Sequence, residues 1–144
     1  RRTTKEISHA YRRSLLRPGD LLLSIRGHVG RLATVPAELD GANITQDTAR
    51  LAVQSANALY VRECLRSLGL QRWMARHTKG VAVRGINLGD VKQMPIPVPP
   101  HQLQEQFAWR VGVAERISQS NYHALAEHDV LFASLQGRAF SGRL

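Results

Sequence analysis

Basic and amide side chains in glycine-containing turns are the residues of this sequence best able to make specific contacts. Arginine can hydrogen-bond bidentately to a guanine edge, and glutamine can do the same with adenine. Glycines beside such residues let the backbone approach a ligand closely. The alternative for each residue is a solvated side chain without a ligand. The residues that we predict to contact a nucleic acid are Arg26, His28, Arg31, Gln46, Lys79 and Arg84.

No arrangement typical of a catalytic or metal site accompanies these residues. The chain has one cysteine and six scattered histidines, which cannot form a zinc framework. Asp20 follows Pro18 and Gly19, a pattern that predicts a turn-forming role. The prolines at 97–100 lack the preceding amide or carboxylate that adenine methyltransferases use to hold their target amine. We therefore expect a protein that is not an enzyme, with no metal and no cofactor of its own.

Positive charge is concentrated in residues 1–101. The chain has 20 Lys and Arg residues against 11 Asp and Glu, a formal net charge of +9. From residue 102 onward the charges balance, with Arg110, Arg116, Arg138 and Arg143 against Glu105, Glu115, Glu127 and Asp129. A basic body joined to a neutral segment is typical of a polyanion binder with a separate mechanical part. The alternative is a generally basic protein without such a partner.

The first half of the chain shows strand and turn signals. Pro18-Gly19-Asp20 predicts a turn before a short strand at 21–25, and a glycine-bounded turn separates it from a second strand at 31–35. Together these segments predict a β-hairpin. Residues 36–45 predict a loop, and residues 50–54 a further strand. Residues 1–17 show no fold-initiating pattern, so we expect more chain ahead of Arg1 in the natural protein.

Helical periodicity begins after residue 54. Ser55 is a candidate N-cap for a helix ending near Gly69, and a second helical piece is expected at 70–76. Residues predicted to lie in the core are Leu59, Leu65, Leu68 and Trp73. A short helical turn is expected within 87–93. The prolines of residues 94–100 exclude helix, so this segment is the predicted domain boundary.

One long helix is predicted from Gln102 to about Ala139, roughly 55 Å at ~1.5 Å per residue. Its apolar residues recur at steps of three and four and predict a single stripe that needs a partner helix. The expected pairing residues are Leu103, Phe107, Ala114, Ile117, Leu125, Phe132 and Leu135. The predicted fold class is therefore α+β, with a mixed domain at 1–100 and a single coiled-coil-forming helix at 101–144.

Five motifs in order resemble the specificity subunits of type I restriction-modification systems. The motifs are the Gly19-Asp20 hairpin through Gly30, Asn43 to Asp47, Val83 to Asp90, Ile96 to Gln106, and Ala139 to Leu144. The fourth resembles the family's "IPxPPxxEQ" entry into a spacer helix, with one extra residue before Glu105-Gln106. The fifth resembles the exit sequence "AFSGEL", with Arg143 in place of the usual glutamate.

The resemblance implies half of a specificity subunit. Residues 1–100 would form a target recognition domain, lacking its N-terminal part, that reads one half of a bipartite duplex DNA site. Residues 101–144 would form a spacer helix that pairs with a second spacer helix of the same subunit or of a homodimer mate. The implied partners are DNA methyltransferase subunits, which would carry S-adenosylmethionine, and a restriction or translocase subunit.

Two other functions remain open from the sequence. A basic coiled-coil module could bind RNA or an acidic protein, and a remnant of a self-contained methyltransferase is a third possibility. The longest apolar run, Leu21 to Ile25, is too short to span a membrane. A single cysteine is typical of a reducing compartment, so the expected location is the cytoplasm.

Overall fold

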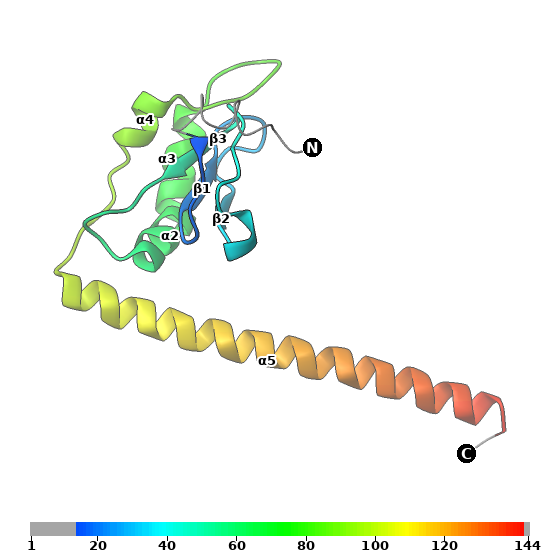
Figure 1. Ribbon diagram of the computed structural model, residues 1–144. Helices are drawn as coiled ribbons and strands as arrows, with labels where there is room; N and C mark the ends of the chain where they lie inside the picture. Colours follow the sequence, from blue (N-terminus) through cyan, green and yellow to red (C-terminus); the bar gives the residue numbers. More distant parts are fainter. Residues whose placement is uncertain (1–13, 143–144) are drawn as a thin grey trace. The chain divides into compact units, whose positions relative to one another are not determined.

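The computed structural model describes residues 14–142 of the chain. It divides into two compact units, residues 1–105 and residues 106–144. Figure 1 shows a body of short strands and helices in the first unit, while the second unit is a single long helix. This mixed content agrees with the predicted α+β class. Arg12 and Arg13, two further basic residues able to contact phosphates, lie outside the described residues.

A small antiparallel sheet forms the centre of the first unit, in the order β2-β1-β3. Strand β1 spans Leu21–Ser24, β2 spans Leu32–Thr34 and β3 spans Thr48–Leu51. The predicted hairpin is confirmed, since Leu22 of β1 pairs with Ala33 of β2. The third strand exists but begins two residues earlier than the predicted 50–54, because its pairing with β1 starts where Ser24 meets Thr48.

The turn ahead of β1 is built as its residue types predict. Gly19 has φ +86°, a left-handed conformation that glycine adopts without strain. The Asp20 carboxylate accepts a hydrogen bond from the Arg17 backbone N–H at 2.9 Å and pairs with the Arg50 guanidinium at 3.2 Å. Asp20 is therefore a turn-forming residue that is also neutralised by Arg50 of β3.

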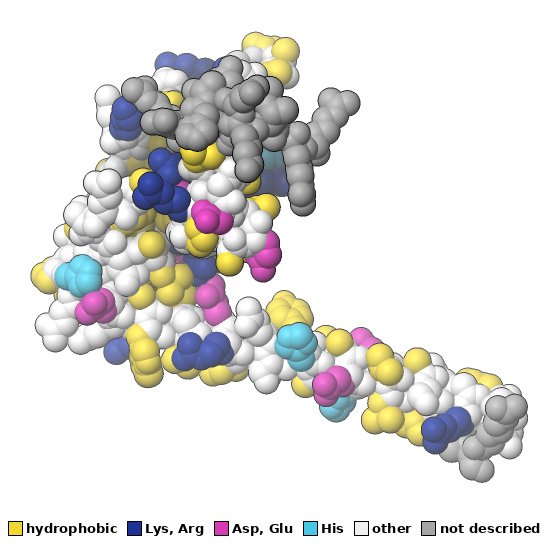
Figure 2. Space-filling model, viewed as in Figure 1, with side chains coloured by type: hydrophobic (Ala, Val, Ile, Leu, Met, Phe, Trp, Pro, Cys, Tyr) yellow, Lys and Arg dark blue, Asp and Glu magenta, His cyan; other side chains and the backbone are white. Residues whose placement is uncertain are grey.

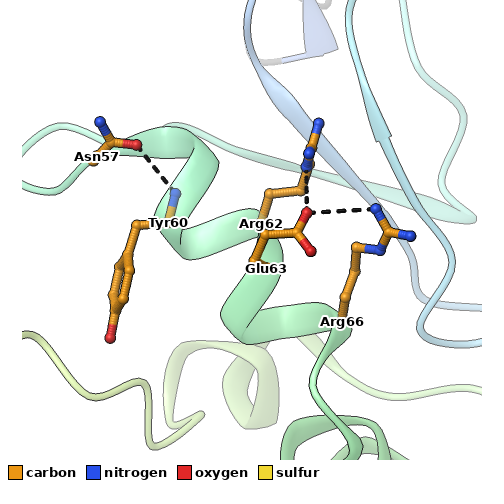
Figure 3. Close-up of polar contacts among 5 residues, drawn as sticks. All are labelled: Asn57, Tyr60, Arg62, Glu63 and Arg66. Atoms are coloured by element: carbon orange, nitrogen blue, oxygen red, sulfur yellow. Dashed lines mark hydrogen bonds and ion pairs between the residues drawn. The ribbon is translucent and has the colours of Figure 1, made fainter. Parts of the chain in front are cut away.

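Helices α2 (Ala58–Arg66) and α3 (Leu68–His77) follow β3, with a short 3-10 helix, η2 (Ala37–Leu39), earlier in the loop after β2. The prediction that Ser55 is the N-cap of α2 is wrong. Asn57 performs that role, because its side chain accepts a hydrogen bond from the Tyr60 N–H at 3.1 Å (Figure 3). The helix also ends earlier than predicted, at Arg66.

Ser67 explains why the break between the two predicted helices lies earlier than expected. Its side chain accepts from the Leu70 N–H while its backbone is extended, so it ends α2 and caps α3 together. Leu68 consequently starts a new helix and is 64% exposed, so its predicted place in the core is wrong. Leu65 is fully buried, and Leu59 and Trp73 are partly buried.

Two adjoining clusters of apolar side chains lie between the sheet and these helices. Alternate residues of β1 face them, as expected for a strand with one covered face. Leu21 packs with Val61, Leu65 and Leu70, while the neighbouring cluster consists of Leu23, Ile25, Ala49, Met74, Ile86 and Val91. The end of β1 is thus fixed against α3 and against the segment that contains α4 (Leu88–Lys92).

The proline segment carries no helix or strand from residue 94 to residue 100, as predicted. Two side chains donate hydrogen bonds to its backbone carbonyls. The Tyr60 hydroxyl donates to the Pro97 carbonyl at 3.0 Å, and the Gln104 amide donates to the Pro99 carbonyl at 2.8 Å. A hydrogen bond with the Cys64 side chain, helped by burial, raises the pKa of Tyr60 to about 12, so the phenol stays protonated and able to donate.

Helix α5 runs from His101 to Phe140, so the predicted helix is confirmed and extends by one residue at each end. Gly112 and Gly137 lie within it and do not interrupt it. None of the helices in the described part of the chain is long and apolar enough to cross a membrane.

Candidate nucleic-acid interface

The turn that joins β1 to β2 presents the first group of predicted contact residues. Gly27 and Gly30 both have positive φ, at +69° and +93°, which lets the chain reverse tightly between them. Backbone hydrogen bonds close the turn from Ser24 N–H to the Arg31 carbonyl, and from Gly30 N–H to the Ser24 carbonyl. Arg26, His28 and Arg31 are exposed on this closed turn.

A second loop is joined to the first by backbone hydrogen bonds. The Gly27 N–H donates to the Arg84 carbonyl at 2.8 Å, and the Ile86 N–H donates to the Ile25 carbonyl at 2.9 Å. A Cβ on Gly85 would lie 3.1 Å from the Ile25 carbonyl oxygen, so glycine permits this close approach. The contact brings Arg84 next to the turn that carries Arg26.

Lys79 also lies near the β1–β2 turn, because a narrow hairpin pairs it with Gly85. Lys79 and Gly85 exchange two backbone hydrogen bonds, both 2.8 Å long. Gly85 also forms a β-bridge with Arg26, so Arg26, Gly85 and Lys79 lie side by side on neighbouring segments. Residues separated by more than fifty positions in the sequence are thus brought together by backbone pairing.

The loop before β3 carries Gln46, another of the predicted contact residues. The Ile25 N–H donates to the Asp47 carbonyl at 2.9 Å, and the Arg26 guanidinium lies 4.0 Å from the Asp47 carboxylate. Gln46, directly before Asp47, is exposed. All six predicted contact residues therefore occur in segments that meet at the end of β1. We call this set (Arg26, His28, Arg31, Gln46, Lys79 and Arg84) the basic loop cluster.

The electrostatics of the basic loop cluster favour an anionic partner. It carries four permanent cations, of which Arg26 faces Asp47 across an exposed ion pair with side chains 53% and 58% exposed. An exposed pair at this distance neutralises little, because solvent screens it. A cavity of about 230 Å³ lies in the cluster and is lined by Gly27, His28, Val29, Ala75, Thr78 and Arg84.

A second basic surface, at strand β2 and helix α2, was not predicted from the sequence. Arg62 and Arg66 share one oxygen of Glu63, at 2.8 and 3.4 Å (Figure 3). Both arginines line a cavity of about 470 Å³ with Gly30, Gln71 and residues 32–34. The helical spacing of Arg62 and Arg66 was a signal that could have been used. Glu63, however, leaves this surface less positive than the basic loop cluster.

The Gln71 side chain holds the Gly30 end of the turn that joins β1 to β2. Its amide nitrogen donates to the Gly30 carbonyl at 3.1 Å and to the Leu65 carbonyl at 2.8 Å. A Cβ on Gly30 would lie 2.7 Å from the Gln71 amide oxygen, so any other residue at position 30 would displace this side chain. The turn is thus held between β1 and helix α3.

The arrangement offers hydrogen-bond donors and positive charge rather than reactive groups. Among residues 14–142, no three His, Cys, Asp or Glu side chains are grouped so that they could hold a metal ion. Arg72 and Arg76 are exposed on α3, and no described bond ties either of them to the cluster. Side chains of these types are able to bind phosphates and base edges.

The apolar residues of α5 form a separate candidate surface, which we call the helix stripe (Leu103, Phe107, Ala114, Ile117, Leu125, Phe132 and Leu135). At about 100° per residue, its members fall within roughly 80° of one face. Its six large side chains are between 41% and 62% exposed. Figure 2 shows hydrophobic side chains along the visible face of this helix. Exposed residues outside the stripe, which the sequence analysis did not assign, include Trp109, Tyr122, Val130 and Leu131.

Comparison with known proteins gives one informative similarity. No protein-family model matches the chain. The chain is 31% identical over 150 residues to the type I restriction enzyme EcoBI specificity subunit of Escherichia coli. That alignment covers 100% of this chain and 31% of the relative, so the chain spans about a third of the relative's length. The similarity supports the class of protein that the sequence motifs suggested.

Proposed function

We propose that this chain is a DNA-reading part of a type I restriction-modification specificity subunit. Its first unit reads one half of a bipartite duplex site, and α5 is the spacer helix that sets the distance to the other half. The observation that carries the proposal is the meeting of three basic or amide-bearing loops at the end of β1. The identity of 31% along the whole chain to a specificity subunit supports the same class.

Recognition follows from the geometry of the loops. Phosphate contacts position a protein on the duplex, whereas contacts to base edges carry sequence information. Arg26 and Arg84 lie on segments held together by backbone hydrogen bonds, so their donors are presented by a fixed framework. Gln46 lies beside them and suits an adenine edge. Arg31 and Lys79 are assigned to phosphates.

The helix stripe supports a role for α5 in assembly. A single helix cannot cover its own apolar face, so the stripe is assigned to a second spacer helix, from the same subunit or from a homodimer mate. Chemistry resides in the partners: DNA methyltransferase subunits that carry S-adenosylmethionine, and a restriction or translocase subunit. This chain contributes recognition and no catalytic residue.

A binding experiment with the full chain, alone and with its methyltransferase subunit, tests the proposal. A randomised duplex DNA pool is selected on the protein at low ionic strength, and the bound fraction is sequenced. A half-site enriched in the bound fraction is the expected result. Equal retention of all duplexes, or stronger binding to duplex RNA of matched sequence, would refute the proposal and favour the RNA-binding alternative.

A further inference from the structure

The hairpin formed by residues 79–85, which we call the finger, has an unusual tip. Its base is closed by the two hydrogen bonds between Lys79 and Gly85, and its four-residue sequence after Gly80 is Val-Ala-Val-Arg. Figure 1 shows this loop, between α3 and α4, projecting from the body of the first unit. Figure 2, in the same view, shows hydrophobic side chains on the projecting part.

The apolar tip residues are exposed to solvent. Val81 has a relative exposure of 103% and Val83 of 65%, and Ala82 between them is also exposed. No other large apolar residue in the described chain is as exposed as Val81. Valines have few rotamers, so they lose little conformational entropy when a partner covers them. The tip therefore presents an exposed apolar patch whose side chains have few rotamers.

Close backbone contacts define the base of the finger. Gly80 has φ +106°, and a Cβ there would overlap the carbonyl oxygen of Val83. The opposite side is attached to β1 through the hydrogen bonds of Arg84 and Ile86 to Gly27 and Ile25. The base of the finger, directly beside the valines, is thus joined to the basic loop cluster.

The surroundings of the tip indicate what covers it. Lys79 and Arg84 flank the apolar residues directly, and Arg26 lies beside Gly85 at the base. A partner must therefore offer apolar groups surrounded by negative charge. The major groove of duplex DNA does so, because the 5-methyl group of thymine projects into it between two rows of phosphates. The major groove also admits a narrow two-stranded β-ribbon.

We propose that the finger enters the major groove and that Val81 and Val83 contact thymine 5-methyl groups, so that the finger selects thymine within the half-site. This inference rests on the proposed function. Short β-branched side chains suit contact with a methyl group, whereas the residues that wedge between base steps are usually longer, such as Phe, Leu, Ile or Met. Lys79 beside the tip provides a phosphate contact that holds the finger in the groove.

Replacement of thymine by uracil tests the inference, because uracil lacks only the 5-methyl group. The full chain is measured against a duplex selected from the randomised pool, with each thymine changed to deoxyuridine in turn. Burial of one methyl group is worth about fourfold in affinity. The wild-type protein should bind about fourfold more weakly when one or two particular thymines are changed, and equally well for the others.

Variants of the finger complete the test. Val81→Ser and Val83→Ser should weaken binding to the thymine duplex by about fourfold and abolish the difference between thymine and uracil at one position each. Arg84→Ala should weaken binding to both duplexes alike. Leu39→Ser, at an exposed leucine of η2, is the matched control and should change neither affinity.

The outcomes separate this inference from the proposed function. If no duplex is enriched from the pool, the proposed function fails and this inference with it. If a half-site is enriched but uracil is tolerated everywhere, or both valine variants keep the wild-type preference for thymine, the inference alone is overturned. Loss of methyltransferase binding by Val81→Ser with unchanged DNA affinity would likewise overturn it and assign the tip to a protein contact.

Discussion

Individual side chains in the basic loop cluster differ in their electrostatic surroundings. Arg26 faces Asp47 at 4.0 Å, whereas Arg84 forms no ion pair within the described part of the chain. A cation without a carboxylate nearby offers its full charge to an incoming anion, since none of it is offset by a neighbour. Arg84 is therefore the better single probe of the interface.

Arg84→Ala should weaken binding to the selected half-site by about tenfold or more, the discrimination expected for one bidentate guanine contact. Only the Arg84 backbone joins the loops, so the fold should remain intact. Binding is measured by gel shift, and folding by thermal unfolding. Arg17→Ala is the matched control, because this exposed arginine precedes the opposite end of β1. Equal losses for both variants would contradict our assignment of the site.

Gln104 illustrates how one buried polar side chain fixes a connection. It is only 2% exposed, accepts from the Asn57 backbone N–H at 2.9 Å and donates to the Pro99 carbonyl at 2.8 Å. Its side chain thus joins the start of α2 to the proline segment. The sequence motif around Glu105-Gln106 gave no indication that the glutamine before it would be buried.

Gln104→Ala should lower the free energy of unfolding by about 1–3 kcal/mol, because it leaves the Asn57 N–H and the Pro99 carbonyl without partners. Chemical denaturation of the full chain measures the change. Gln102→Ala, at an exposed position of the same helical turn, should change stability by less than about 0.5 kcal/mol. Similar values for the two variants would show that these hydrogen bonds do not stabilise the fold.

At the level of elements, the most regular segments were predicted best and their ends least well. The hairpin follows from glycine-containing turns on either side of a short apolar run, and the long helix from apolar residues at steps of three and four. Ser55, Asn57 and Ser67 are all suitable N-caps, and the sequence does not show that Asn57 and Ser67 are used while Ser55 is not. Tertiary packing decides between them, because Leu65 and Leu70 must both face β1 and a break at Ser67 permits this.

The helix stripe gives the prediction that belongs to this scale. The double variant Leu125→Glu/Phe132→Glu places two charges on the stripe and should abolish helix pairing, since burial of an unpaired charge is costly. If the partner helix belongs to a homodimer mate, sedimentation should then show the mass of the monomer. If it is the second spacer helix of the same subunit, sedimentation should show that this helix no longer binds. The first unit should keep its wild-type unfolding transition.

The matched control places the same charge change on the opposite face of the helix. His123→Glu/Gln134→Glu lies about 200° from the centre of the stripe, at about 100° per residue, and should leave pairing intact. An unaltered assembly mass for Leu125→Glu/Phe132→Glu would exclude the stripe as the pairing surface.

At the level of the whole molecule, positive charge is separated from the apolar helix. The net charge of +9 lies entirely in residues 1–101, and the contact residues gather at one end of β1. Phosphate binding releases counterions, so its affinity depends on salt in proportion to the phosphates neutralised. A protein that bound an acidic polypeptide would show no preference for duplex DNA.

The logarithm of the DNA binding constant should fall with the logarithm of salt concentration with a slope of about −2, if Arg31 and Lys79 each neutralise one phosphate. Lys79→Ala should reduce that slope by about 1 without changing the selected sequence. Fluorescence anisotropy with the selected duplex over a salt series measures both slopes. A slope near zero, or one unchanged by Lys79→Ala, would exclude this phosphate contact.

The sequence alone determined the α+β fold class and the concentration of positive charge in residues 1–101, because periodicity and composition are local properties. It identified Arg26, His28, Arg31, Gln46, Lys79 and Arg84 by residue type and neighbouring glycines. It could not show that residues 26, 47, 79 and 85 lie side by side, because backbone pairing between distant segments depends on how the core packs. Only the tertiary structure revealed the exposed tip of Val81 and Val83, since a valine has the same chemistry in a core and on a finger, and packing decides which it occupies.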